Sequence, residues 1–247
     1  MPPRQFVRGR GAVLLAFVAI ALVFAVLVLH ELDSAEPAAV KTTEQIELGE
    51  RIPLPSPRTV SETSVEEALA QRRSVRVYSD ASLSLPEVAQ LLWAAQGITA
   101  PGGGRTAPSA GALYPLALYL VVGSVDGLDT GVYHYRPEEH ELEKVQEGDA
   151  RAALAAAALG QECVEDAAID LVFAGVYERT TEKYGDRGIQ YVHLEAGHAA
   201  QNVYLQAEAL ELGTVVIGAF DEREVARVLN LQEQSTPLYL MPVGRKG

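Results

Sequence analysis

The sequence contains a single cysteine, Cys163. One cysteine excludes an intrachain disulfide, a cysteine-based metal site and a redox-active cysteine pair. The chain also lacks a phosphate-binding P-loop and a G-x-S-x-G nucleophile motif. Its Gly-rich stretch "GGGRTAPSAG" is not enclosed by a strand–turn–helix unit, so it is not a dinucleotide-binding fingerprint. The chemistry of this protein must therefore rest on other residues.

Positive charge is scarce as well. The formal net charge is -13 at pH 7 and no basic stripe is present, which argues against a nucleic-acid partner. His193 and His198 are five positions apart, and on a helix they would be rotated by about 140° from each other. They do not share a metal-binding face, and we expect no metal site.

One long apolar run stands at the N-terminus. Residues 12–29 carry no charge, with arginines before them and acidic residues after them. This pattern predicts a single-pass membrane anchor within residues 1–32, with the remainder exported by the positive-inside rule. A cleaved signal peptide is the alternative, although its cleavage site would be poor, and a buried core helix is a third.

The composition changes after the anchor. Residues 33–62 are rich in Pro, Ser, Thr and Glu without apolar periodicity, which predicts a flexible linker. Residues 63–247 then have the length of one domain with a full core.

Helix and strand signals alternate irregularly along this domain. Ser64 and Ser84 are each followed by a Glu three positions later, which predicts two capped helix starts. Strands are expected at 117–122 and 168–176, in a hairpin made by "GVYHY" and "ELEKV", and at "TVVIGAF" and "PLYLMPVG". The longest helix is expected at 190–212, closed by Gly213. We predict an α+β fold with a central, mainly antiparallel sheet flanked by helices.

Two basic segments are candidates for binding an anion. The segment "RRSVR" places three guanidiniums and a hydroxyl within residues 72–76, and arginine offers forked, always-charged donors to phosphate. The C-terminal "GRKG" at residues 244–247 could join the same anion. The alternatives are a solvated basic turn and a solvated tail.

Two stretches of small residues could lie against a planar ligand. In "RTAPSAGALYP", residues 105–115, glycine and alanine allow close approach to the backbone. Gly218 and Ala219 follow an apolar strand and precede a helix capped by Asp221, where backbone amides can face a ligand. A tightly packed turn is the alternative in each case.

Lys183 and Tyr184 form a candidate catalytic pair. A neighbouring ammonium stabilises the phenolate and lowers the pKa of a tyrosine, which could then act as a general base or acid. The alternative is an exposed helix end. On the long helix that follows, His198, Gln201 and Glu208 continue the side of Leu194, which is typical of a subunit contact.

Taken in order, five segments resemble the nitroreductase superfamily of FMN proteins. They are "RRSVRVYSD", "TAPSAGALYPLALYLVV", "EKYGDRGIQYVHLEAGHAAQNVYLQA", "LGTVVIGAFD" and "PLYLMPVGRK". The forms "PSAGALYP" and "KYG…AGH" are similar to the azoline-dehydrogenase branch, often called SagB-type. The resemblance covers about residues 65–246.

This resemblance implies an α+β homodimer with FMN held at the subunit interface. Flavin N5 would exchange hydride, and the nicotinamide of NAD(P)H would need no separate nucleotide fold. The resemblance assigns the phosphate and ribityl contacts to Arg72, Arg73, Ser74, Arg76 and Arg245. The loop that reaches the other subunit's flavin would be Pro108, Ser109 and Ala110, and the backbone near N5 would be Gly218 and Ala219. The catalytic pair would be Lys183 and Tyr184.

Three functions are compatible with the resemblance. The first is an FMN-dependent oxidoreductase that passes hydride between NAD(P)H and a quinone, a nitro compound or another small organic acceptor. The second is an azoline dehydrogenase that oxidises thiazoline or oxazoline rings in peptides, with Tyr184 as base. The third is a non-catalytic flavin-binding or accessory scaffold.

Overall fold

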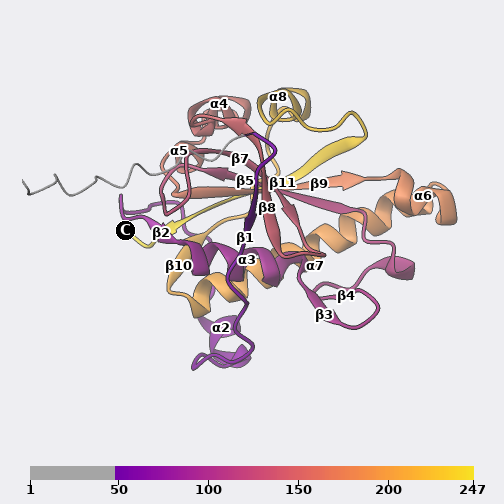
Figure 1. Ribbon diagram of the computed structural model, residues 1–247, viewed down its shortest axis with the longest axis horizontal. Helices are drawn as coiled ribbons and strands as arrows, with labels where there is room; N and C mark the ends of the chain where they lie inside the picture. The colour runs from indigo at the N-terminus through magenta and orange to yellow at the C-terminus, as the bar shows by residue number, and fades with distance from the viewer. Residues whose placement is uncertain (1–47) are drawn as a thin grey trace, which may run out of the picture. The chain divides into compact units, whose positions relative to one another are not determined.

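A computed structural model describes residues 48–247, and a seven-stranded antiparallel sheet organises them (Figure 1). The strand order is β1-β8-β7-β5-β9-β11-β10. The predicted α+β fold with a largely antiparallel sheet is confirmed. The strands are β1 (Arg51–Pro53), β5 (Leu116–Val122), β7 (Gly131–Arg136), β8 (Glu141–Glu147), β9 (Ile169–Val176), β10 (Leu212–Thr214) and β11 (Ser235–Arg245).

Helices cover both faces of the sheet (Figure 1). Alternate residues of β5 enter two separate apolar clusters, which form the core on either face. One face packs against α3 (Leu85–Gln96) and α7 (Arg187–Ala209), with α2 (Val65–Gln71) beyond them. The other face carries α4 (Arg151–Ala157), α5 (Glu162–Glu165) and α8 (Glu222–Val228).

Shorter elements complete the described residues. The helix α6 (Glu178–Tyr184) follows β9 and leads directly into α7. Two small sheets stand apart from the central one. They pair β2 (Leu83–Ser84) with β6 (Val125–Asp126), and β3 (Ile98–Ala100) with β4 (Gly104–Arg105). A single-turn 3₁₀ helix, η1 (Ala110–Ala112), follows β4.

The helix-start signals of the sequence are confirmed. The Ser64 hydroxyl accepts the backbone N–H of Glu67 at 3.0 Å. The second start forms the full capping box, in which the Glu87 carboxylate also accepts the N–H of Ser84. The Asp221 carboxylate accepts two backbone N–H groups at the start of α8. These local contacts fix the orientation of each helix as it leaves the preceding segment.

The predicted start of the folded domain at residue 63 is wrong. Arg51–Pro53, which the composition assigned to the linker, form β1 and pair with β8. Leu54 is buried in the core behind this strand. Three residues that end in a proline are too few to show a periodicity, and their pairing depends on the exposed edge of β8.

Gly213 does not close the longest helix. The helix α7 ends at Ala209, and Gly213 lies in β10 opposite Gly244. A Cβ at Gly213 would lie 2.7 Å from Cγ1 of Val75, so glycine is needed there for close packing and not as a helix cap. The expected strand "TVVIGAF" is also shorter, since only Thr214 belongs to β10 and Ile217 makes one isolated bridge to Leu240.

The expected membrane anchor at residues 12–29 and most of the linker lie outside the described residues. Within residues 48–247, every helix is too short or too polar to cross a bilayer.

Candidate functional site

The basic segment after α2 is fixed by a tyrosine of the long helix. The guanidinium of Arg72 lies over the ring of Tyr204, 5.0 Å from its centroid. The hydroxyls of Ser74 and Tyr204 are hydrogen-bonded at 3.1 Å, and Tyr204 also accepts the N–H of Val216 at 2.8 Å. Tyr204 thereby joins two segments that the sequence had singled out separately, the basic segment and the run that leads to Gly218.

The other two arginines of the segment are exposed. Arg73 donates to the carbonyls of Ala70 and Arg72, which helps to close the end of α2. Arg76 makes no ion pair among residues 48–247, and its charge partly offsets the burial that raises the pKa of the Cys163 thiol. Both guanidiniums therefore retain donors for an anion.

The two C-terminal cations, Arg245 and Lys246, form ion pairs with different helices. Arg245, the predicted phosphate contact, makes two 2.9 Å bonds to the carboxylate of Glu87. Lys246 instead pairs at 2.9 Å with Glu208, which lies one helical turn beyond Tyr204. Lys246 therefore lies on the same side as the Arg72–Ser74 cluster, whereas Arg245 is ion-paired to α3.

Burial alone would raise the pKa of Glu87. Hydrogen bonds from Ser84 and from the Arg245 guanidinium outweigh burial and hold this pKa below its ordinary value. Glu87 therefore stays ionised and keeps Arg245 in place near neutral pH.

Gly218 and Ala219 are exposed between β10 and α8. The nearest atoms to a Cβ at Gly218 are those of the Tyr239 ring, 3.8 Å away. Within the described residues, no backbone carbonyl accepts the N–H of Gly218 or Ala219, although the Ala219 carbonyl accepts from Gln161 at 3.0 Å. These N–H groups are available as donors, as the sequence suggested.

The loop of small residues has a strained backbone. Gly111, Ala112 and Tyr114 all have positive φ angles of 64°, 54° and 46°. Two of the three carry side chains, for which this region is unfavourable. Ser109 stabilises the loop because its hydroxyl accepts the N–H of Tyr114 at 2.9 Å. The loop is therefore a fixed structure whose exposed tip is Gly111 and Ala112.

The tip of this loop lies against the Lys183–Tyr184 pair. A Cβ at Gly111 would be 2.7 Å from the Tyr184 hydroxyl and 2.9 Å from the Lys183 ammonium. The ammonium also lies over the Tyr184 ring, 5.4 Å from its centroid. Glycine at the tip leaves room for both side chains, and the structure brings together two candidate groups that are about seventy positions apart in the sequence.

A buried carboxylate lies beneath the loop, and sequence reasoning missed it. Glu195 of α7 is 2 % exposed, and one of its oxygens has no partner within the described residues. Burial raises its pKa to about 7, against the opposing effects of a Ser109 hydrogen bond and the Arg105 charge. Its position between the apolar Leu194 and Ala196 gave no signal of a functional group.

The candidate residues form two groups at opposite ends of α7 (Figure 1). The Arg72–Ser74 group contacts Tyr204 near the C-terminal end, and Tyr184 precedes Arg187 at the N-terminal end. At 1.5 Å of rise per residue, the two groups are separated by about 25 Å along the helix. We call these two groups the first and the second half-site.

Comparisons with known proteins show the family of this chain. The sequence matches the model of the Nitroreductase family over residues 69–245. It is 49% identical over 187 residues to the nitroreductase-like protein MJ1384 of Methanocaldococcus jannaschii, covering 76% of this chain and 93% of that one. It is 30% identical over 159 residues to the Escherichia coli microcin B17-processing protein McbC, covering 62% of this chain and 58% of McbC.

A solved structure shows the same fold. The crystal structure of a nitroreductase-like protein from Ralstonia eutropha matches with a TM-score of 0.71 and 32% identity, covering 85% of this chain and 93% of that one. The family model spans most of the described sheet and helices, including Arg72–Ser74, Gly111, Lys183 and Tyr184. The chain belongs to the nitroreductase family.

Proposed function

We propose that this protein is an FMN-dependent oxidoreductase that works as a homodimer. It would pass hydride between NAD(P)H and a quinone, a nitro compound or another small organic acceptor. Membership of the nitroreductase family supports the reaction class, because FMN is the cofactor that the family typically binds. The remaining support comes from the two half-sites.

The first half-site suits the flavin mononucleotide. Arg72, Arg73, Arg76 and Lys246 bring positive charge together in a chain whose net charge is -13, which favours a phosphate. The free N–H groups at Gly218 and Ala219 would donate to polar atoms of the ring. When bound, FMN supplies a reversible acceptor for two electrons and a proton.

The second half-site would come from a partner subunit. The separation of about 25 Å along α7 exceeds the length of extended FMN, so one flavin cannot contact both half-sites of one protomer. In a two-fold dimer each half-site of one copy can face the complementary half-site of the other. Pro108, Ser109 and Ala110 would then cover the flavin bound by the partner.

The observation that carries the catalytic assignment is the contact of Gly111 with Lys183 and Tyr184. It places a hydroxyl and an ammonium on the surface of the loop that would face the flavin. Tyr184 Oη can give a proton to a substrate or take one from it. Lys183 Nζ stabilises the oxygen whenever it is negatively charged. Residues of this chain therefore handle the proton that accompanies each hydride.

The azoline-dehydrogenase function is a second candidate. It is favoured by the similarity to McbC, whose name describes processing of microcin B17, and by the same Lys183–Tyr184 pair. In that reaction Tyr184 Oη would take a proton from a ring carbon while the hydride leaves to the cofactor. Both candidates use the same half-sites and differ in substrate.

Activity of the purified full-length protein separates these functions. We expect flavin absorption after reconstitution with FMN, and NADH-dependent turnover of menadione. Turnover of a thiazoline-containing peptide in its place would establish the azoline reaction, and bound FMN without either activity would establish the scaffold. A protein that shows no flavin absorption after reconstitution would refute the proposal.

Tyr184→Phe tests the proton-handling role. It should reduce turnover of the accepted substrate by about 100-fold without loss of flavin. Tyr191→Phe is the matched control, because the Tyr191 ring packs edge-on against Tyr184 and the change removes only a neighbouring hydroxyl. Equal activity of the two variants would exclude Tyr184 as the acid or base.

A further inference from the structure

A tyrosine and a histidine form an exposed pair outside both half-sites. Tyr177 lies between β9 and α6, and His193 lies on α7. The Tyr177 hydroxyl and Nε2 of His193 are hydrogen-bonded at 2.8 Å, and the two rings are stacked with centroids 5.7 Å apart. Tyr177 is half-buried and His193 is exposed. The pair is therefore ordered by its own contact and open to a ligand.

The pair shares a face of α7 with the first half-site. His193 and Tyr204 are eleven positions apart, which is close to three helical turns. The two side chains therefore leave α7 in nearly the same direction, about 16 Å apart along its axis. Tyr204 is the residue that contacts Arg72 and Ser74. Extended FMN can span the separation between these two ends.

The free backbone N–H groups of the first half-site lie between the two ends. They come directly after Ile217, which bridges Leu240 of β11 in antiparallel orientation, so the chain beyond Ile217 runs toward the start of β11. The start of β11 pairs with the end of β9, directly before Tyr177. The negative charge of Glu222 acts on the Tyr177 hydroxyl, which agrees with this direction. The edge of the sheet thus leads from Tyr204 to Tyr177.

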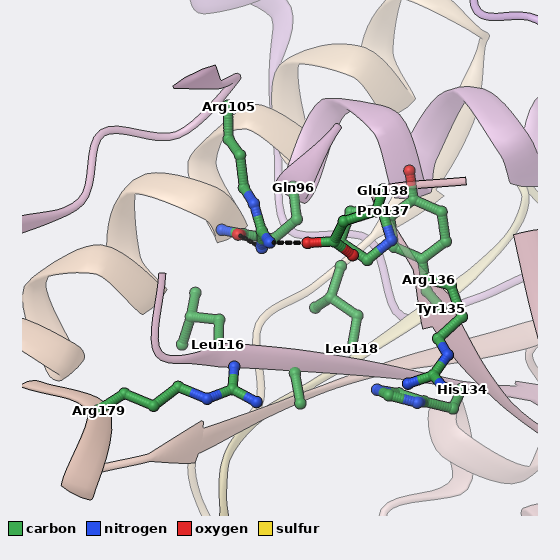
Figure 2. Close-up of a pocket in the computed structure, with 11 residues that line it drawn as sticks. Gln96, Arg105, Leu116, Leu118, His134, Tyr135, Arg136, Pro137, Glu138 and Arg179 are labelled. Atoms are coloured by element: carbon green, nitrogen blue, oxygen red, sulfur yellow. Dashed lines mark hydrogen bonds and ion pairs between the residues drawn. The ribbon is translucent and has the colours of Figure 1, made fainter. Parts of the chain in front are cut away.

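Tyr177 is held firmly where β9 leads into α6. Its carbonyl accepts the N–H groups of Thr180 and Thr181, both at 2.9 Å. Arg179 of the same turn extends beside β5 (Figure 2), where it donates to the Tyr114 carbonyl at 3.2 Å. The guanidinium nearest in sequence to the pair is thus engaged elsewhere, and the Tyr177 ring stands on a fixed backbone.

The contact decides which imidazole nitrogen carries the proton. Burial raises the pKa of Tyr177, and the charge of Glu222 raises it further. The phenol therefore keeps its proton and donates to Nε2 of a neutral imidazole, which leaves the imidazole proton on Nδ1. A charged imidazole would carry a proton there as well. Within residues 48–247, Nδ1 of His193 has no hydrogen-bond partner, so the pair presents this one N–H group as a donor.

We propose that Nδ1–H of His193 donates a hydrogen bond to the ring system of the FMN whose phosphate binds at Arg72–Arg76. This contact rests on the proposed function, since it requires FMN in the first half-site. The ring system carries carbonyl oxygens and unprotonated nitrogens that accept such a bond. Tyr177 acts as a positioning residue, because it holds the tautomer and the orientation of His193.

Three substitutions of His193 separate the roles of its two nitrogens. Asparagine places an amide NH₂ near the position of Nδ1, and glutamine places one near Nε2. His193→Asn should therefore keep the donor to the flavin, whereas His193→Gln should keep only the contact with Tyr177. His193→Leu removes both. Because His193 is exposed, we expect all three variants to fold.

The experiment is a fluorescence titration of the flavin-free full-length protein with FMN. His193→Leu and His193→Gln should each weaken FMN binding about tenfold, which is the effect of one lost hydrogen bond. His193→Asn should bind FMN within about twofold of the natural protein. Tyr177→Phe should weaken binding about threefold, because it releases the imidazole without removing the donor.

NMR of the ¹⁵N-labelled protein reads the donor itself. The Nδ1–H signal of exposed His193 should be lost to exchange with water in the flavin-free protein and should appear on saturation with FMN; His193→Leu assigns it. Equal FMN affinities of the natural protein and His193→Leu, equal affinities of the Asn and Gln variants, or an Nδ1–H that does not respond to FMN would overturn this contact alone. A natural protein that binds no FMN would refute the proposed function, and this contact with it.

Discussion

At the scale of single residues, Glu195 is a buried carboxyl group of the candidate site whose ionisation affects stability. It is buried beneath the loop with one oxygen unpartnered, and its pKa is raised to about 7. Between its ordinary pKa of 4.5 and about 7, the folded protein binds more protons at this site than the unfolded chain does. The free energy of unfolding therefore falls as the pH rises through this window, and the loss is complete above it.

Glu195→Gln should remove this pH-dependent loss. The amide has the same shape and can still bond to Ser109, but it carries no charge to desolvate. We expect the variant to gain stability over the natural protein at pH 8, by up to a few kcal/mol at about 1.4 kcal/mol per pKa unit, and little at pH 5. Urea denaturation of both proteins at the two pH values measures the difference.

Exposed Glu182→Gln is the control, for which the stability difference should not depend on pH. Because the natural protein and the variant share every other carboxyl group, including buried Asp170, those contributions cancel. A Glu195→Gln effect of the same size at pH 5 and pH 8 would contradict the raised pKa.

The sequence predicted the segments of the candidate site better than it predicted which residues contact each other there. Lys183, Tyr184 and the Gly111 loop were chosen from the chain, but their contact depends on a turn of α6 onto a distant loop. Tyr204 was missed because it lies within an ordinary amphipathic helix. The sequence did not show that Lys246, rather than Arg245, turns toward the basic segment. The directions of side chains at the end of β11 are known only when the neighbouring elements are placed.

At the scale of elements, helices and strands that depend on contacts between nearby residues could be predicted from the sequence. Elements that depend on packing against distant residues could not. The Ser84 capping box, the Asp221 cap and the hairpin of β7 and β8 all follow from contacts within a few residues. β1 could not be predicted, because nothing in "RIP" indicates a strand until the edge of β8 is present. The role of Gly213 likewise depends on Val75, which is remote in sequence.

Removing β1 should destabilise the domain. A fragment of residues 60–247 loses β1, the buried Leu54 and the two hydrogen bonds between Arg58 and Gln90, all of which a fragment of 48–247 retains. Burial of one leucine alone contributes about 2 kcal/mol, so we expect at least that loss in the free energy of unfolding. Urea denaturation of the two fragments measures it, and equal stability would show that β1 is dispensable.

At the scale of the whole molecule, the proposed dimer would place a second copy against the outer face of α7. Leu194 is 52 % exposed there, and Gly197, His198 and Gln201 are exposed beside it. A Cβ at Gly197 would meet no atom within 4 Å in the protomer. Glycine on an exposed helix face costs about 1 kcal/mol relative to alanine, and close approach of another backbone would explain its presence.

Gly197→Glu should therefore prevent dimer formation without destabilising the folded monomer. The protomer has room for the side chain, and glutamate is the better helix former, so the monomer should keep or gain stability. In a two-fold dimer through this face, two glutamates would meet near the axis, where they would clash and repel each other. We expect light scattering to show a monomer, with most of the bound FMN lost because each flavin would need both half-sites.

Ala152→Glu is the matched control, since it places the same charge on an exposed position of α4, on the opposite face of the sheet (Figure 1). It should leave both the mass and the flavin content unchanged. A Gly197→Glu variant that remains dimeric would move the interface away from this face of α7. A monomeric variant that still retains its full flavin content would show that one protomer holds FMN unaided, which would refute the division of the site between two subunits.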